Sequence, residues 1–473
     1  MILFIESRDC NSDVSENNKT DDLITSAVSR MFKLGGVMSR VGMSMAAGAV
    51  SNLFRGADAA SENSLERMLR NAARVTETLG KLKGLPMKLG QMISLHEGLL
   101  PPEVVQVLSA LQAKAPSVPF ETLREHMRAE IGDNFDLIEH LDPEPYASAS
   151  IGQVHRARLK DGRDVVLKSQ YPGIDKVIEA DMKNLRGLLT SLFSMFTKAN
   201  LEPVWEELHT ILLQELDYEL EARHIARMRE NFADESSLVL PVVIPELTSR
   251  RVICMEFLAG ISPEDACSEE YPAELRNKWG LALAELTLQS FLKHRFLHAD
   301  PNFANFAFTA DGRVIMYDFG CIKEIPEQVA EGYGMAARSL VAGDFNGIGE
   351  HLRRMGIRRL NGDALPEHIL QDYGRVLAEP FRESPPYTFG EDADLYERLM
   401  ELGRLHWMEG MDMEIPRHVI FIDRTINGHL GNLCKLRSTG PWRDILLRHT
   451  EPLAAASPPS TPDLSTAGRD AAS

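Results

Sequence analysis

The sequence predicts an α+β fold in which a helical extension comes first, a part rich in strands follows, and a mainly helical part comes last. Three observations indicate this. Strand patterns joined by an Asp-Gly turn begin near residue 146 and recur up to residue 257. Helical periodicity dominates the 473-residue chain before and after that part. A second Asp-Gly turn, at residue 311, joins two short apolar runs within the helical part.

The predicted organisation has five parts. They are residues 1–60, an acidic disordered segment and a small-residue basic helix; 61–140, the helical extension; 141–258, the β-rich lobe; 259–440, the helical lobe; and 441–473, a disordered tail. The tail assignment rests on the high content of Ala, Ser, Pro and Thr in Ala454–Ser473.

Composition describes an ordinary globular chain and excludes general nucleic-acid binding. The net charge is −18, whereas nucleic-acid binding needs a basic surface. Five scattered cysteines show no Cys-x-x-Cys spacing, which indicates a reducing compartment and no zinc site. No apolar run reaches the length of a membrane-spanning helix, and the N-terminus lacks the basic lead of a signal peptide. We therefore expect a cytoplasmic protein, either free or peripheral on the inner face of a membrane.

Residues 23–57 raise the question of membrane contact. They contain no acidic side chain, and Arg30, Lys33, Arg40 and Arg55 alternate with small and apolar residues. A basic, weakly apolar helix can lie on an anionic membrane surface. The other interpretation is a flexible lead-in or a helix packed on the domain, and the sequence leaves both open.

The extension begins with a clear amphipathic helix over Ser61–Leu79. The segment after it contains Lys88 and Gln91, which share one face of a helix because they are three residues apart. Further helices are predicted over Pro102–Ala113 and Phe120–Glu130.

The β-rich lobe starts with a loop of small residues, followed by a hairpin. The loop contains Ala147, Ser148, Ala149 and Ser150. Val154–Leu159 and Asp164–Lys168 are the predicted strands of the hairpin, and Asp161-Gly162 is its turn. In folds that transfer phosphoryl groups, such a loop covers the phosphates of ATP and a strand lysine such as Lys168 pairs with them. The alternative is a lysine at a solvated strand edge.

Four carboxylates lie between Glu215 and Glu221. On one helix these two residues are about 120° apart around the axis. One of them can therefore meet Lys168 while the other faces a different element. The alternative is a solvated acidic helix.

Two more strands and a long helix complete the approach to the large lobe. The strands are predicted over Val242–Ile244 and Val252–Phe257. The second passes Glu256 and runs toward Gly260 like a strand entering a hinge, so we expect Glu256 beside the nucleotide. An amphipathic helix over Leu275–Lys293 follows.

The chemistry is concentrated between His298 and Gly320. Asp300 is followed five residues later by Asn305, and Asp318-Phe-Gly closes the stretch. Phosphoryl transfer needs this set: one carboxylate near the attacking nucleophile, and an amide and a second carboxylate that hold Mg²⁺ on the phosphates.

The spacing in this stretch predicts a metal site. Phe306–Phe308 and Val314–Met316 should pair through the Asp311-Gly312 turn, which brings Asn305 and Asp318 together at the outer ends of one hairpin. The alternative, a helix cap and an ordinary turn, would not require the upstream lysine that Lys168 supplies.

Together these residues resemble the UbiB/AarF-like family of atypical protein-kinase-like proteins, over roughly Leu65–Leu436. Ala147–Ser150 looks like the alanine-rich loop of the family, and Lys88, Gly90 and Gln91 match its Lys-x-Gly-Gln motif. Glu215 and Asp217 match its Glu-x-Asp motif, and Glu221 its ion-pairing helix glutamate. The resemblance implies a bilobal protein-kinase-like fold with the extension folded over the nucleotide site.

The resemblance also implies roles. Lys168 would hold the α- and β-phosphates of ATP, steadied by Glu221. Asp300 would be the catalytic carboxylate, and Asn305 and Asp318 the Mg²⁺ ligands. Lys88 and Gln91 would reach into the space where a protein substrate normally lies, with Glu215 coupling them to the nucleotide.

These roles favour an ATPase or a small-molecule or lipid kinase over a protein kinase. The family is linked to ubiquinone biosynthesis and membrane lipids, which implies a lipid-like substrate and quinone-biosynthesis enzymes as partners. The alternatives are a nucleotide-responsive scaffold and an aminoglycoside-phosphotransferase-like enzyme. The chain departs from the family pattern at Asn302-Phe303-Ala304, usually His-Pro-Gly, and at His224, usually Asn.

Overall fold

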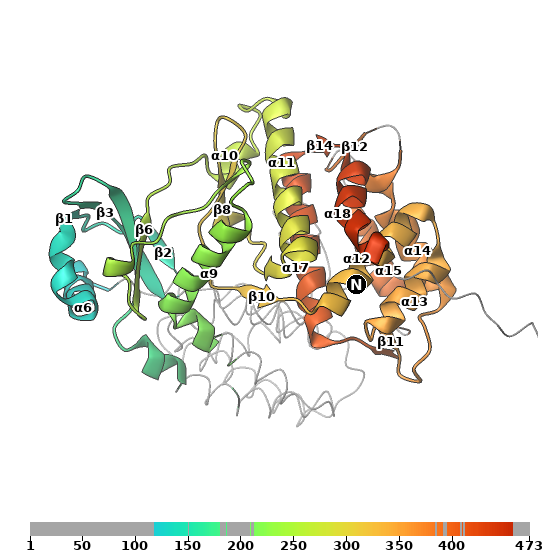
Figure 1. Cartoon of the computed structure of the whole chain (residues 1–473), viewed down its shortest axis with the longest axis horizontal. Coiled ribbons are helices and arrows are strands. Elements are labelled where there is room, and N and C mark those ends of the chain that lie inside the picture. Colours follow the sequence, from blue (N-terminus) through green and yellow to red (C-terminus); the bar gives the residue numbers. More distant parts are fainter. Residues whose placement is uncertain are drawn as a thin grey trace, which may run out of the picture.

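The computed structural model describes two lobes placed side by side, one rich in strands and one helical (Figure 1). It describes residues 118–149, 151–179, 186, 209, 212–383, 386–390, 395–406, 409 and 412–456. Residues 23–57, the helix predicted over Ser61–Leu79, Lys88, Gln91 and Ser150 lie outside the described residues. Among the helices of the described part, none is long and apolar enough to cross a membrane.

The small lobe is an antiparallel sheet with strand order β1-β3-β4-β6 and with β2 paired to β3. Its elements are α6 (Phe120–Ile131), β1 (Ile138–Leu141), β2 (Ala147–Ala149), β3 (Gly152–Leu159), β4 (Asp164–Gln170), α9 (Tyr218–Asn231) and β6 (Val252–Glu256). Helix α6 buries Leu123 and Met127 against sheet residues that include Leu159 and Leu167. The sheet therefore has one face closed by apolar side chains.

The predicted hairpin of the small lobe is confirmed. Strands β3 and β4 pair from Gly152↔Gln170 to Arg158↔Asp164. Gly162 adopts a φ of 91°, a conformation that glycine reaches without steric cost. Lys168 is paired with Val154 on one side and with Ile253 of β6 on the other, so it stands on a central strand.

Three strand expectations need correction. The small-residue segment expected as a loop is strand β2, because Ala147 and Ser148 extend the ladder of β3 opposite Val154 and Gln153. Strand β1 was missed, so the lobe begins before residue 141. Val242–Ile244 forms only an isolated bridge between Val243 and Met255. Prolines at 241 and 245 flank it, and proline cannot donate to a ladder.

The large lobe is helical, with short strand pairs between the helices. Its main helices are α11 (Ala273–Leu288), α12 (Glu327–Ala342), α13 (Phe345–Arg354), α14 (Glu367–Leu377), α15 (Leu395–Leu405), α17 (Arg417–Leu436) and α18 (Trp442–Ala456), with a short α10 (Pro263–Ala266). Its strands are β5 (Leu238–Val239), β7 (Phe296–His298), β8 (Phe306–Phe308), β9 (Val314–Met316), β10 (Ile322–Glu324), β11 (Arg358–Arg359), β12 (Tyr387–Thr388), β13 (Met413–Glu414) and β14 (Thr439–Gly440). Helix α11 continues as a π-helical turn over Gln289–Lys293, so the helix predicted there is confirmed with a change of winding.

The tail expected from residue 441 begins later than predicted. Helix α18 runs from Trp442 to Ala456 and lies against α12 and α11. Trp442, Ile445 and Leu446 are buried, which supplies the packing that holds the helix. The biased composition that suggested a tail starts only at Ala454, and residues 457–473 lie outside the described part.

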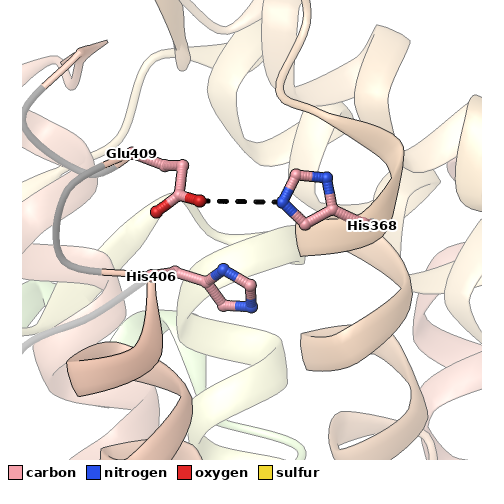
Figure 2. Close-up of side chains that lie close together, drawn as sticks. All are labelled: His368, His406 and Glu409. Carbon is pink, nitrogen blue, oxygen red and sulfur yellow. Dashed lines mark ion pairs between the residues drawn. The ribbon is translucent and has the colours of Figure 1, made fainter.

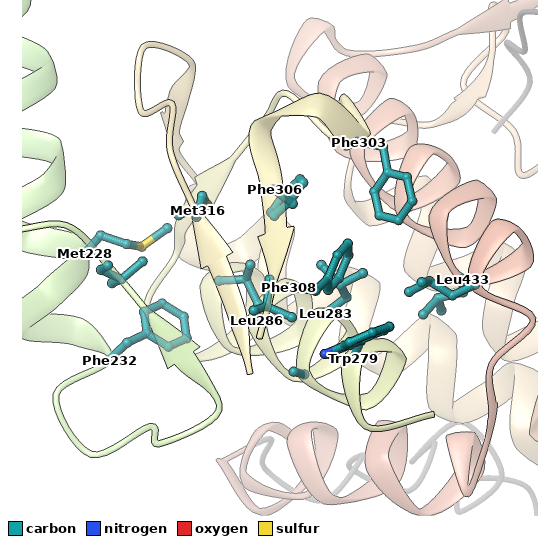
Figure 3. Packing of buried hydrophobic residues seen from close by; sticks show 14 of the residues in the cluster. Met228, Phe232, Trp279, Leu283, Leu286, Phe303, Phe306, Phe308, Met316 and Leu433 are labelled. Atoms are coloured by element: carbon teal, nitrogen blue, oxygen red, sulfur yellow. The ribbon is translucent and has the colours of Figure 1, made fainter. Parts of the chain in front are cut away.

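A buried aromatic cluster supports the second hairpin (Figure 3). Strands β8 and β9 pair with Phe306 opposite Met316, as predicted. Phe306 and Phe308 point into a core shared with Trp279 and Leu283 of α11. The Trp279 Nε1 also donates to the Thr309 carbonyl oxygen at 2.9 Å. These contacts fix the hairpin near its turn, so the opposite ends of its two strands can carry polar residues.

The close approach of β3 to β4 makes Gly152 hard to replace. A Cβ atom at Gly152 would lie 2.1 Å from the Ser169 carbonyl oxygen, whereas one at Gly431 of α17 would meet nothing within 4 Å. We expect Gly152→Ala to lower the free energy of unfolding by about 1–3 kcal/mol, since strand backbone must move. Gly431→Ala, the matched control, should raise it by roughly 0.5–1 kcal/mol. Urea titration measures both, and a Gly152→Ala variant as stable as wild type would contradict this packing.

Candidate active site

Lys168 joins the two lobes through an ion-pair network. Its Nζ lies 2.9 Å and 3.0 Å from the two carboxylate oxygens of Glu221 on α9, and 3.3 Å from Oδ2 of Asp318, which follows β9. The Lys168 side chain is 12% exposed and that of Glu221 3%. The contact between Lys168 and Glu221 that the sequence led us to expect is present, and a solvated acidic helix is excluded for Glu221.

The environment keeps Lys168 charged. Burial by itself would lower the pKa of Lys168, but the carboxylates of Asp318 and Glu221 raise that pKa well above its ordinary value. The ring of Tyr218 lies 5.0 Å from Nζ and adds a cation–π contact. A permanently protonated amine can bind an anion but cannot serve as a general base.

Glu215 and Glu221 do not share one helix, which corrects the helical geometry used to place them. Residues 212–215 are helical, the chain turns at Leu216, and Asp217 with φ −120° and ψ 89° caps the start of α9. The Asp217 side chain accepts a hydrogen bond from the Leu220 amide at 2.9 Å. An aspartate whose carboxylate can take a free N–H favours a new helix start over continuation.

Glu215 nevertheless reaches the same site from its own segment. A Cβ atom built on Gly320 would lie 3.5 Å from Oε1 of Glu215 and 3.2 Å from Oδ1 of Asp318. Both carboxylates therefore lie beside Gly320. The predicted role of Glu215 in coupling the extension to the nucleotide stays a prediction, because Lys88 and Gln91 are outside the described residues.

The Asp318-Phe319-Gly320 segment is held by its backbone. His298 donates through Nε2 to the Asp318 carbonyl oxygen at 2.7 Å, and His224 donates through Nδ1 to the Phe319 carbonyl oxygen at 3.0 Å. The Phe319 amide donates to Oε1 of Glu221 at 3.3 Å, and the Phe319 ring is fully buried. The Glu221 carboxylate, which pairs with Lys168, thus also fixes the turn that contains Asp318. The departure at His224 gives the turn a further brace.

Asp300 and Asn305 lie together on the loop after β7. The Asn305 side chain donates to the Asp300 carbonyl oxygen at 3.3 Å, and the Asn305 carbonyl oxygen accepts from the Tyr317 amide at 3.0 Å. That last bond extends the β8–β9 ladder, so Asn305 and Asp318 flank the same end of the hairpin, as predicted. Their function as ligands stays a prediction.

The unusual Asn302-Phe303-Ala304 sequence forms an ordered turn. Oδ1 of Asn302 accepts from the Ala304 amide at 3.2 Å and caps a 3-10 turn over Phe303–Asn305. Phe303 is buried in the core. The chain therefore replaces a glycine at this loop with a side-chain cap and an aromatic anchor.

Helix α17 supports the loop over Asp300–Asn305, a contact that sequence reasoning missed. Asn432 donates through Nδ2 to the Pro301 carbonyl oxygen at 2.9 Å, and a Cβ atom at Gly428 would lie 2.2 Å from Cγ of Pro301. The ring of His429 packs edge-on against Phe306 at 5.7 Å. A glycine and an asparagine four residues apart on one helix face were the available signal.

The predicted nucleotide-loop residues lie at the edge of the small lobe. Ala147 and Ser148 are exposed on β2, and Glu256 is exposed at the end of β6. Beyond Glu256, Tyr317 of the large lobe donates to the Leu258 carbonyl oxygen at 2.9 Å. Glu256 therefore stands where the chain crosses between the lobes, and its contact with the nucleotide stays a prediction.

The residues present fit Mg²⁺ and a phosphate chain. Asp318 offers a carboxylate and Asn305 an amide oxygen, which are the hard oxygen ligands that Mg²⁺ prefers. Lys168 supplies the fixed positive charge that phosphate oxygens require. A β-rich lobe with this lysine, joined to a helical lobe with the Asp300, Asn305 and Asp318 set, defines a bilobal kinase-like protein.

A family model described as an ABC1 atypical kinase-like domain matches residues 110–352. The chain belongs to the ABC1 atypical kinase-like family, and the resemblance to UbiB/AarF-like proteins is confirmed. A kinase-like fold in general implies ATP and a divalent metal as ligands.

Relatives from several organisms match most of the chain. It is 32% identical to the mitochondrial atypical kinase coq-8 of Caenorhabditis elegans over 78% of this chain, but it spans only 49% of that relative. It is 30% identical to the mitochondrial atypical kinase COQ8 of Saccharomyces cerevisiae, covering 78% of this chain and 74% of that one.

The fold is similar to that of a solved protein. Rv3197 from Mycobacterium tuberculosis, solved in complex with erythromycin, is 25% identical with a TM-score of 0.59 and covers 82% of this chain and 97% of that one. The bilobal kinase-like fold predicted from the sequence is confirmed.

Burial of His429 against Phe306 makes stability depend on pH. Burial is the main cause that lowers the pKa of His429 to about 3. Below the unfolded-state pKa of about 6.5, the unfolded chain binds a proton that the folded chain refuses, so stability falls as the pH falls from 6.5 toward 3. Between pH 7.0 and 5.5 this residue should cost about 1 kcal/mol of unfolding free energy.

The variant His429→Leu removes the titrating group and keeps an apolar filler. Between pH 7.0 and 5.5 this variant should lose about 1 kcal/mol less unfolding free energy than wild type does. Urea unfolding at both pH values measures the difference. An identical loss in the two proteins would place the acid sensitivity elsewhere. The exposed His140→Leu on β1 is the control.

Proposed function

We propose that this protein binds ATP with Mg²⁺ at the junction of its lobes and either hydrolyses it or phosphorylates a small, lipid-like molecule. The observation that carries the proposal is the contact of Lys168 with both Glu221 and Asp318. That contact supports the proposal because it puts a cation suited to phosphate beside a carboxylate suited to a metal ion. Family membership supports a phosphotransferase or ATPase in general, because the family is one of atypical kinases.

Each residue then has a defined task. Bound Mg²⁺ would neutralise negative charge on the β- and γ-phosphates. Asn305 and Asp318 would hold the ion, and Lys168 would exchange its contact with Asp318 for one with a phosphate oxygen. Glu221 would keep Lys168 in position during that exchange, since it alone binds the amine through both oxygens. Asp300 would orient the attacking hydroxyl or water and accept its proton.

A cavity in the large lobe supports a lipid-like ligand. It has a volume of about 310 Å³, and its walls from α11, α12, α14, α17 and α18 are mainly apolar. Cavities of this size and character bind small apolar molecules. Its lining includes His429 and Leu433 of α17, the helix whose Gly428 and Asn432 hold Pro301 of the loop that carries Asp300. A molecule bound in this cavity would therefore contact α17, the helix that supports the loop with Asp300.

The matched relatives suggest the pathway. Because they are COQ8-type mitochondrial atypical kinases, we place this protein in ubiquinone biosynthesis, with quinone-pathway enzymes as partners. A cytoplasmic or organellar location with peripheral membrane contact through residues 23–57 is part of this proposal. The scaffold and aminoglycoside-phosphotransferase-like alternatives gain no support from the matched relatives.

Two asparagine variants test the assigned roles. Asp318→Asn should abolish Mg²⁺-dependent ADP binding, because an amide cannot replace the charge of a metal-binding carboxylate. Asp300→Asn should leave that binding unchanged and lower phosphate release by roughly 10²–10⁴-fold. Calorimetry with Mg-ADP and a phosphate-release assay measure the two effects.

Asp311→Asn is the matched control, because it makes the same chemical change at the far end of the same hairpin. Asn-Gly fits this turn as well as Asp-Gly does. No Mg²⁺-dependent binding of ATP or ADP by the wild-type protein would end the proposal. Turnover that survives in Asp300→Asn would show that this carboxylate is not catalytic.

A further inference from the structure

Two histidines and a glutamate gather in the large lobe, away from the lobe junction that holds Lys168 (Figures 1 and 2). His368 lies on α14, His406 directly follows α15, and Glu409 is three residues further on. One ligand atom from each lies within 4.8 Å of those of the other two. Nε2 of His368 is 3.9 Å from Oε1 of Glu409, and the ring of His406 faces this pair (Figure 2).

Asp372 orients the buried member of the cluster. Nε2 of His406 donates to Oδ2 of Asp372 at 3.0 Å, which leaves Nδ1 with its lone pair as the ligand atom. His406 is 5% exposed, and its ring packs against Tyr373 and His368 at 6.0 Å and 5.5 Å. A histidine that gives its other N–H to a carboxylate is the usual arrangement of a metal-binding imidazole.

We propose that His368, His406 and Glu409 bind one zinc ion, with water as the fourth ligand. Two imidazoles and one carboxylate suit Zn²⁺, whereas Mg²⁺ and Ca²⁺ prefer oxygen ligands alone. Zinc bond lengths place tetrahedral ligand atoms roughly 3.3 Å apart. The 3.9 Å between Nε2 of His368 and Oε1 of Glu409 is longer than that, so binding an ion requires these two partly exposed side chains to draw closer together.

The ligands of this site differ from those of the cysteine-based zinc site that the sequence argued against. The absence of Cys-x-x-Cys spacing predicted no zinc site, but that argument concerns thiolate ligands only. Here the ligands come from helix α14 and from the residues that follow α15, so an ion would tie these two segments together. The assignment is independent of the proposed ATP chemistry, because none of its residues contacts Lys168, Asp300 or Asp318 in a described interaction.

The test is a zinc titration of the untagged, metal-free full chain in excess Mg²⁺, against a chelating dye. Wild type should bind one equivalent and melt at a higher temperature with Zn²⁺. His368→Ala and Glu409→Gln, both at partly exposed positions, should each weaken that binding by at least about tenfold. Asp372→Asn removes only the orienting carboxylate and should weaken it by about 10–100-fold.

Two controls separate this site from other zinc ligands in a chain with 14 histidines. His140→Ala removes an exposed histidine on β1, and Asp318→Asn removes the proposed Mg²⁺ ligand; neither should change zinc binding. Co²⁺ in place of zinc should give the visible absorption of a four-coordinate ion, lost in His368→Ala. Zinc binding that is absent in wild type, or equal in wild type, His368→Ala and Glu409→Gln, would overturn the proposal.

Discussion

The buried ammonium of Lys168 is the constraint on which the site depends. A charge in that position is stable only if carboxylates surround it, and they come from two other elements, Glu221 on α9 and Asp318 after β9. Removing one partner of a buried pair leaves an uncompensated charge and costs about 3–5 kcal/mol. The sheet, the helix and the hairpin therefore meet at one amine.

The ion pair between Lys168 and Glu221 also positions the backbone of the Asp318-Phe319-Gly320 turn. Glu221 accepts from both Lys168 and the Phe319 amide, so the position of the helix sets the position of the turn. His298 and His224 then fix the carbonyl oxygens on either side of that amide. Phe319 anchors the turn in the aromatic core under the hairpin. Asp318 is partly exposed, and its carboxylate contacts Lys168 and accepts a hydrogen bond from the Gly320 amide.

The loop over Asp300–Asn305 has a comparable support from the large lobe. Asn302 and Phe303 order the loop from within, and α17 grips Pro301 through Asn432. The apolar cavity borders the same helix. The loop that carries Asp300 and the cavity thus both contact α17, so a molecule in the cavity would lie against the helix that supports this loop.

Local signals in the sequence predicted the hairpins and the ion pair. Asp-Gly between apolar runs demands a tight turn, and the functional logic of Asp318 and Asn305 demanded a lysine, which Lys168 provides. Where the prediction failed, the deciding contacts are distant in the chain. The small residues of β2 become a strand only because β3 offers a free edge, and α18 is held by burial of Trp442 that composition does not reveal.

The break before α9 and the role of α17 were missed for a related reason. In the sequence, Asp217 resembles another acidic residue within a helix. In the structure, its carboxylate accepts a hydrogen bond from the Leu220 amide and caps the start of α9. Asn432 has no motif around it, and its importance comes only from the proximity of Pro301. One-dimensional patterns record periodicity and turn chemistry, but they do not record which helix face meets a loop 131 residues away.

A double-mutant cycle between Lys168 and Glu221 tests the central claim most directly. Lys168→Met, Glu221→Gln and the double variant are compared with wild type by urea unfolding at pH 7. If the buried amine depends on this carboxylate, the double variant should be more stable than the sum of the single losses predicts, with a coupling of about 1–3 kcal/mol. Single losses that add to within about 0.5 kcal/mol would show that the two residues do not interact, and the arrangement described here would be wrong.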